Sequence, residues 1–247
     1  MEEEVKDLKE WLDGVVNFNL PDWKMLAPVP LYMEQVISYI NEILSPLSIN
    51  DKGKLTSFMV NNYVKAGMIK APEKKKYTNE HLGYLIAISC LKDTLSMTDL
   101  SLLIEMDSAV STDKSALYHF FKSITTEQIH DKAEATISSI ERYERRYKKE
   151  IANNDPSAEK NLRDALALTA FRLAIQSQVN QIISKAILCS IAEDLHGEKD
   201  WQEVNSKGES EVKREMKISE AESERIANIK RKYESAKKNN DLKKENE

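Results

Sequence analysis

The sequence predicts an all-α, mostly helical protein, in which a small N-terminal domain precedes long C-terminal helices that form a bundle or a dimeric coiled coil. Only 6 glycines and 6 prolines interrupt the 247 residues, and aromatic residues make up 7%. A β-sandwich or barrel normally has more turn glycines and more aromatic residues. Apolar residues instead recur at intervals of three and four, which is the spacing of one helix face.

The N-terminal part of the chain is predicted to contain short helices and a connector. Residues 4–18 have an amphipathic helical pattern, and the proline-containing residues 19–31 are predicted to be an extended connector. A second helical stripe ends at Leu44. After a loop, residues 56–66 are predicted to form a third helix, with Gly67 just past its end.

The next segment favours a hairpin followed by two helices. Residues 68–78 contain Pro72 and a run of lysines, so a small hairpin or loop is expected there. Thr78 can cap a fourth helix, and Ser96 with Asp99 three residues later forms a capping box for a fifth.

Two long helices complete the predicted fold. From Ile129 the apolar spacing predicts a helix that ends near Asn153, and Asp155 before a proline is typical of a new helix start. Residues 157–196 lack proline and glycine and would form a helix of roughly 55 to 60 Å. Their apolar band is broad enough to contact more than one neighbour.

These patterns divide the chain into four predicted regions. A homodimer is expected through residues 127–196, and a monomer with an intramolecular bundle is the alternative. The charged tail is predicted to be a frayed helix or disordered, and a plain solvated tail explains it best. The boundaries are 1–31 for the first helix and connector, 32–107 for the small N-terminal domain, 108–197 for the helical region and 198–247 for the tail.

Neither an enzyme nor a membrane protein is expected. The first ten residues are acidic where a secretory signal is basic, and no apolar run is long enough to span a bilayer, so a cytoplasmic location is predicted. Cys90 and Cys189 lie far apart, which argues against a disulfide framework or zinc site. The four histidines are scattered, and His81 is expected on a helix surface. No catalytic residue, metal or cofactor is predicted.

The charge is unevenly distributed. Seven lysines and one acid, Glu73, give +6 between residues 52 and 76, which leaves −11 for the rest of a chain whose total is −5. A basic island on an acidic protein suggests an anionic partner. The lysines are Lys52, Lys54, Lys65, Lys70, Lys74, Lys75 and Lys76.

The predicted helix 56–66 has one polar face. At about 100° per residue, Ser57, Asn61, Asn62 and Lys65 share one arc, and most apolar residues lie opposite. Asparagine can pair with adenine, and lysine can reach guanine or phosphate. Phe58 is the exception on the polar arc and could contact a thymine methyl or a neighbouring loop. An amphipathic surface helix without a ligand would show the same pattern.

Residues 59–69, MVNNYVKAGMI, resemble the recognition helix and following turn of MerR-type winged-helix regulators. Asn61 and Asn62 stand where that family has arginine and its first tyrosine. More broadly, residues 20–106, about a third of the chain, resemble a bacterial family that is catalogued as a domain of unknown function near MerR. The residues that match MerR in kind are Tyr63, Lys65, Gly67, Met68 and Ile69, followed by a lysine-rich wing at Lys74, Lys75, Lys76 and Tyr77.

The resemblance implies a winged helix-turn-helix domain in a dimeric, sequence-specific regulator of transcription that binds double-stranded DNA. Helix 56–66 would enter the major groove, and wing residues 70–77 would lie on phosphates. Metal sensing does not carry over, because Cys189 has no partner cysteine. The alternative is a helical adaptor whose degenerate winged helix docks an acidic protein. The expected DNA-binding residues are Thr56, Ser57, Asn61, Asn62, Tyr63, Lys65, Lys70, Lys74, Lys75, Lys76 and Tyr77.

One aromatic cluster remains outside this interpretation. Tyr118, Phe120 and Phe121, together with Met106, are best explained by core packing, and an effector pocket is the alternative.

Overall fold

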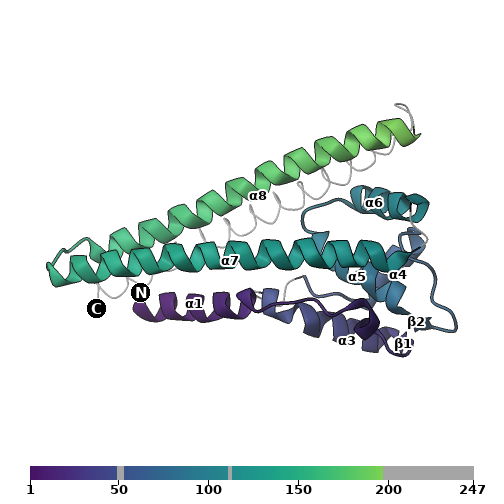
Figure 1. The fold of residues 1–247 in the computed structure, drawn as a ribbon, viewed down its shortest axis with the longest axis horizontal. Coiled ribbons are helices and arrows are strands. Elements are labelled where there is room, and N and C mark those ends of the chain that lie inside the picture. The colour runs from purple at the N-terminus through teal and green to yellow at the C-terminus, as the bar shows by residue number, and fades with distance from the viewer. Residues whose placement is uncertain (49–52, 111–112, 197–247) are drawn as a thin grey trace, which may run out of the picture. The chain divides into compact units, whose positions relative to one another are not determined.

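A computed structural model of the chain describes residues 1–48, 53–110 and 113–196 (Figure 1). This part is mostly helical, as predicted. None of its helices is apolar over a length that would cross a membrane. The elements are α1 (Glu2–Val16), α2 (Trp23–Leu26), β1 (Leu31–Tyr32), α3 (Met33–Leu44), the 3-10 turn η1 (Ser45–Leu47), α4 (Ser57–Lys65), β2 (Lys76–Tyr77), α5 (Asn79–Leu91), α6 (Met97–Val110), α7 (Lys114–Ala152) and α8 (Ala158–His196).

The chain divides into two compact units, Met1–Leu188 and Cys189–Glu247. The second unit is described only in the last turns of α8, so the predicted tail 198–247 lies outside the described residues. All sites below belong to the first unit.

The short elements form a small block around α3, α4 and α5. Strands β1 and β2 pair antiparallel, with Leu31 opposite Tyr77 and Tyr32 opposite Lys76. A fully extended connector over residues 19–31 is therefore wrong in detail, because it contains α2 and the start of β1. Leu26 in α2 is 1% exposed, so its burial accounts for this short helix.

The α3–α4 connection is held by one amide side chain. Asn41 in α3 donates from Nδ2 to the Leu55 carbonyl at 3.0 Å and accepts from the Leu55 amide at Oδ1, at 2.8 Å. Both backbone groups of Leu55 are thereby satisfied just before α4 begins. Beneath them, Val36, Ile40 and Val60 are fully buried.

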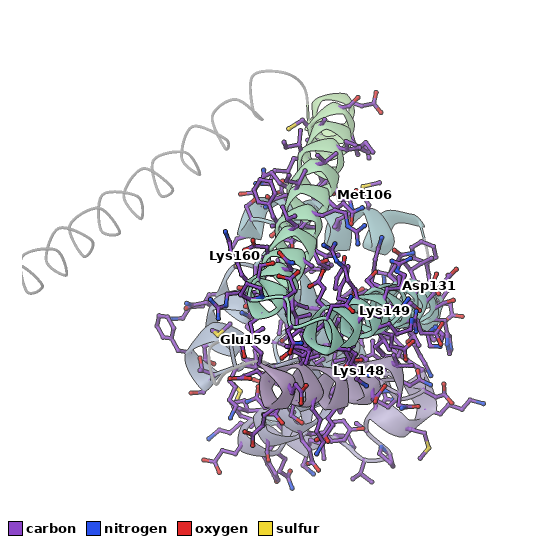
Figure 2. The ribbon with its side chains drawn as sticks, turned by 90° about the vertical axis from the view of Figure 1, so that its left-hand side faces the viewer. Met106, Asp131, Lys148, Lys149, Glu159 and Lys160 are labelled. Carbon is purple, nitrogen blue, oxygen red and sulfur yellow. The ribbon has the colours of Figure 1, made fainter. Side chains whose placement is uncertain are left out.

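A separate core joins α1, α7 and the first turns of α8. Lys9 in α1 pairs with Glu144 in α7 at 2.9 Å, and the Tyr143 hydroxyl lies 3.0 Å from the Thr169 hydroxyl of α8. Figure 2 looks along these helices from the end where α7 and α8 are joined. The buried members of this core are Val5, Leu12, Val15, Ala133, Ile140, Tyr147, Ala158 and Leu162.

The long helices begin at side-chain caps. Asp113 accepts from the Ser115 amide at 2.9 Å, so α7 starts fifteen residues before Ile129, where the apolar spacing placed its first residue. Asp155 accepts from the amide and hydroxyl of Ser157, which confirms the predicted helix start, and the Ser157 hydroxyl lowers the pKa of Asp155. A short polar side chain thus satisfies free amides at each helix start.

Among the described residues, none covers one face of α8. Seven large apolar side chains on it are each between 47% and 68% exposed. They extend over twenty residues, or about 28 Å of helix from the first to the last. This α8 stripe consists of Leu168, Phe171, Ile175, Val179, Ile182, Ile183 and Ile187.

Candidate nucleic-acid interface

Helix α4 is fixed at both ends. Thr56 accepts from the Met59 amide through Oγ1 at 3.3 Å, as an N-cap threonine does. After Lys65 the chain turns at Gly67, whose φ of +73° favours glycine, and the Met68 amide returns to the Tyr63 carbonyl at 3.0 Å. The predicted boundaries 56–66 are therefore close to those observed, Ser57–Lys65.

The two faces of α4 differ in burial. Val60 and Tyr63 face the core at 0% and 4% exposure. Ser57, Asn61 and Lys65 are exposed on the other side, as the helical wheel predicts, and Asn62 is half-buried. Phe58 is 71% exposed, so it does not pack against a neighbouring loop.

The turn at residues 73–76, which we call the wing turn after the wing that the resemblance implies, carries two lysines in an unusual backbone conformation. Lys74 and Lys75 have φ angles of +48° and +64°, and the Lys76 amide closes the turn on the Glu73 carbonyl at 2.8 Å. Two consecutive residues with positive φ are typical of a tight hairpin turn, where Asn-Gly is favoured. A non-glycine residue in this conformation costs roughly 1–2 kcal/mol.

The neighbouring lysines point to solvent from both sides of the wing. Lys76 Nζ lies 5.5 Å from the centroid of the Tyr32 ring, an aromatic contact on β1 that sequence reasoning missed. A two-residue strand has no periodicity that could reveal it. Lys70 Nζ pairs with Glu80 Oε1 at 3.1 Å, yet the Lys70 side chain stays 74% exposed. Such a surface pair contributes about 0–1 kcal/mol and leaves Lys70 accessible to another anion.

The exposed polar and basic residues of α4 and of the segment after it all lie between residues 56 and 76, and we call this set the α4–wing face. Two predicted site residues, Tyr63 and Tyr77, lie in the core at 4% and 2% exposure, and burial raises the pKa of both. Lys52 lies outside the described residues. The α4–wing face comprises Thr56, Ser57, Asn61, Lys65, Lys70, Lys74, Lys75 and Lys76.

His81 is buried, so the expectation of a helix-surface residue was wrong. It is 7% exposed, and its Nδ1 accepts from the Thr78 amide at 3.0 Å. Its ring also meets Tyr77 edge-on, with centroids 5.3 Å apart. Burial lowers the pKa of His81. The side chain therefore completes the cap of α5 directly behind the wing.

Other reactive groups are less suited to chemistry. Burial raises the pKa of the Cys90 thiol to about 11, which disfavours the thiolate needed for nucleophilic attack. Within the described ranges, no three histidine, cysteine or acidic side chains gather as a metal site.

Comparisons with known proteins identify one domain. Residues 20–124 match the model of a family described as a domain of unknown function, DUF1836. The match begins in the connector before α2 and ends within α7, so it includes the whole α4–wing face. Searches of curated proteins and of solved structures gave no match.

Proposed function

We propose that this protein is a dimeric transcription regulator that reads double-stranded DNA with a MerR-like winged helix-turn-helix. The observation that carries the proposal is the α4–wing face: a helix of major-groove size exposes hydroxyl, amide and ammonium groups, and an exposed lysine-rich turn follows at residues 73–76. In this arrangement α4 lies in the major groove, where Asn61 can address adenine and Lys65 guanine or phosphate. Lys70 and Lys74 to Lys76 contact the backbone.

The wing turn supports an anionic ligand over a purely structural role. Stability alone would favour Asn-Gly at positions 74 and 75, because both residues have positive φ. Two adjacent lysines at this tip repel each other and add backbone strain. Strained residues of this kind concentrate at functional sites. Phosphate contacts would offset both costs.

The α8 stripe supports the dimer through residues 127–196. Full burial of a Val, Leu, Ile or Phe side chain contributes roughly 1.5–3 kcal/mol, and seven about half-exposed side chains would therefore contribute on the order of 5–10 kcal/mol before the costs of association. A two-fold dimer places two recognition helices about 34 Å apart, on successive major-groove turns. It also doubles the number of phosphate contacts.

Selection of the full chain against random-sequence duplex DNA at low salt tests the proposal. Enrichment of a two-fold symmetric motif is expected, and no duplex binding at low salt would overturn it. Asn61→Ala should relax the preference at one base position. An unchanged sequence preference would remove Asn61 from the base-reading set.

Salt dependence tests the wing. Replacing Lys74, Lys75 and Lys76 by alanine should reduce the slope of log K against log salt by about three, without changing sequence preference. The matched control replaces three exposed lysines at the far end of α7 and start of α8, Lys148, Lys149 and Lys160 (Figure 2). Lys148 lies about 45 Å along the helix from Tyr118, so this control should keep the wild-type slope.

A protein-docking adaptor is the second candidate, and Phe58 favours it. An aromatic ring that is 71% exposed in the middle of a polar face suits a protein partner as well as a thymine methyl. Phe58→Ala separates the two functions. A regulator should lose preference at one thymine, whereas an adaptor should show no DNA preference to lose.

A further inference from the structure

An apolar cavity of about 310 Å³ lies between α5, α6 and α7. Its size falls at the lower end of the range for small-molecule sites. Aromatic and aliphatic side chains form nearly all of its wall. Among them are Trp23, Ala87, Leu103, Phe120 and Phe121.

One wall of the cavity is set by close packing around Gly83. A Cβ atom on this residue would come within 2.8 Å of the Trp23 ring and 3.3 Å of the Tyr118 ring. The Tyr118 hydroxyl donates to the Pro21 carbonyl at 2.9 Å, and the two ring centroids lie 5.6 Å apart. Both rings are therefore held in place, and the cavity is preformed.

Exposure distinguishes the cavity wall from its rim. Tyr118 is 4% exposed, so the predicted core packing holds for this residue, but it is wrong for Phe120, and Phe121 and Met106 are half-buried. Phe120 is 66% exposed, and Leu117 and Ile124 on the same side of α7 are 37% and 44% exposed. These apolar side chains remain uncovered around an apolar cavity, where a bound molecule would shield them.

Size and charge define what fits. A cavity of about 310 Å³ is of the size that holds a small molecule. Glu80 and Lys114 are the charged residues of the lining. Glu80 pairs with Lys70, and Lys114 likewise has an interaction partner. Neither requires a counter-charge from a ligand.

We propose that this cavity binds a small, uncharged, aromatic or aliphatic molecule. The cavity wall contains no residue of the α4–wing face, and its Glu80 pairs with Lys70 of that face. Its ligand would contact the aromatic rings and shield Phe120 from water. Burial of apolar surface would provide most of the affinity.

Fluorescence titration of the full chain with N-phenyl-1-naphthylamine, an uncharged apolar dye, tests the site. Saturable binding of one dye per chain is expected, and the absence of saturable binding would overturn the proposal. The sulfonated relative 8-anilino-1-naphthalenesulfonate should bind at least tenfold more weakly. Tighter binding of the sulfonate would overturn the uncharged ligand class.

Substitution of two phenylalanines of similar exposure shows where the dye binds. Phe120→Ala should weaken binding at least fivefold, whereas Phe171→Ala on the α8 stripe, which removes a ring of similar exposure (64%), should leave it unchanged. The reverse result would place the dye on α8 and overturn the proposal.

A cavity-filling variant gives a second test. Ala87→Phe should reduce dye affinity at least tenfold, with folding checked by circular dichroism. If that variant does not fold, the exposed Phe120 position still decides the result.

Discussion

Helices α4 and α8 each leave one face uncovered, but the two faces have opposite chemistry. Apart from the Phe58 ring, the exposed side of α4 presents the polar side chains of Ser57, Asn61 and Lys65, whereas the exposed side of α8 presents a row of apolar side chains. Water solvates the first face well and the second poorly. The two partners proposed above require this difference, because a polyanion would bind α4 and an apolar surface would cover α8.

The two helices are also positioned by different forces. Helix α4 is short, and side-chain hydrogen bonds at Asn41 and Thr56 fix where it starts. Helix α8 is long, and the core that it shares with α1 and α7 determines its orientation. Single polar substitutions should therefore disturb α4, while α8 should respond mainly to changes in its apolar surface.

The largest effect is expected from charges placed on the α8 stripe. Ile175→Asp combined with Ile182→Asp places two carboxylates on the α8 stripe. An unpaired charge in an apolar interface costs several kcal/mol. The dissociation constant of the dimer should therefore rise by about a thousandfold or more. Sedimentation velocity should show a micromolar dimer for the parent and a monomer for the variant.

The control for that experiment is Ala174→Asp, which adds the same charge at an exposed position outside the stripe. It should leave the dimer intact. A parent protein that is monomeric at micromolar concentration would contradict the proposed dimer, and equal dissociation by both variants would contradict the assignment to this face.

The next largest effect concerns the hydrogen bonds that hold the loop before α4. Asn41→Ala removes two hydrogen bonds to Leu55. At 0.5–1.5 kcal/mol each, their loss should lower the free energy of unfolding by about 2 kcal/mol. Asn41→Asp keeps the acceptor for the Leu55 amide and should lose less. Urea denaturation measures both, and equal stability of the alanine variant and the parent would show that the amide does not hold this loop.

A smaller effect separates charge from stability in the wing. Lys74→Asn with Lys75→Gly supplies the preferred residues for two positive φ angles. The melting temperature should rise, whereas the salt slope for DNA should fall by about two, since two of the proposed phosphate contacts are lost. A rise in stability without any loss of DNA affinity would remove these two lysines from the interface.

The sequence was most informative where local chemistry decides the structure. Thr56 and Gly67 delimit α4, and the Ser96 hydroxyl accepts from the Asp99 amide while Asp99 accepts from the Ser96 amide, as a capping box requires. Helical spacing also placed the polar face of α4 correctly. These signals need only neighbouring residues, so a single sequence contains them.

Features that depend on distant neighbours could not be predicted. The pairing of Leu31 with Tyr77 joins residues that are far apart in the sequence, and a two-residue strand has too few positions for a pattern. Tyr63 matched a recognition-helix tyrosine by type, yet its ring packs in the core. The cavity beside Phe120 arises only when three helices meet, so the sequence left its aromatic residues open to two interpretations.

The smallest effect is the pH dependence of stability that His81 causes. Burial lowers the pKa of His81, and its Nδ1 must be unprotonated to accept from the Thr78 amide. The folded state therefore binds fewer protons than the unfolded state, whose histidine titrates near about 6.5. This contribution to stability is fully present above that pH and is lost as the pH falls below it, by at most about 1.4 kcal/mol per pH unit.

His81→Gln should remove this dependence, because glutamine three residues after Thr78 completes an ordinary capping box. Urea denaturation between pH 7.5 and 5.5 should show a flatter profile for this variant, while His119→Gln, at an exposed position on α7, should keep the parent slope. The α8 stripe contains no titratable side chain, so dimerisation should stay constant over the same range. If the dimer dissociated over the same pH range in which the free energy of unfolding falls, the α4–wing face and the α8 stripe would be coupled.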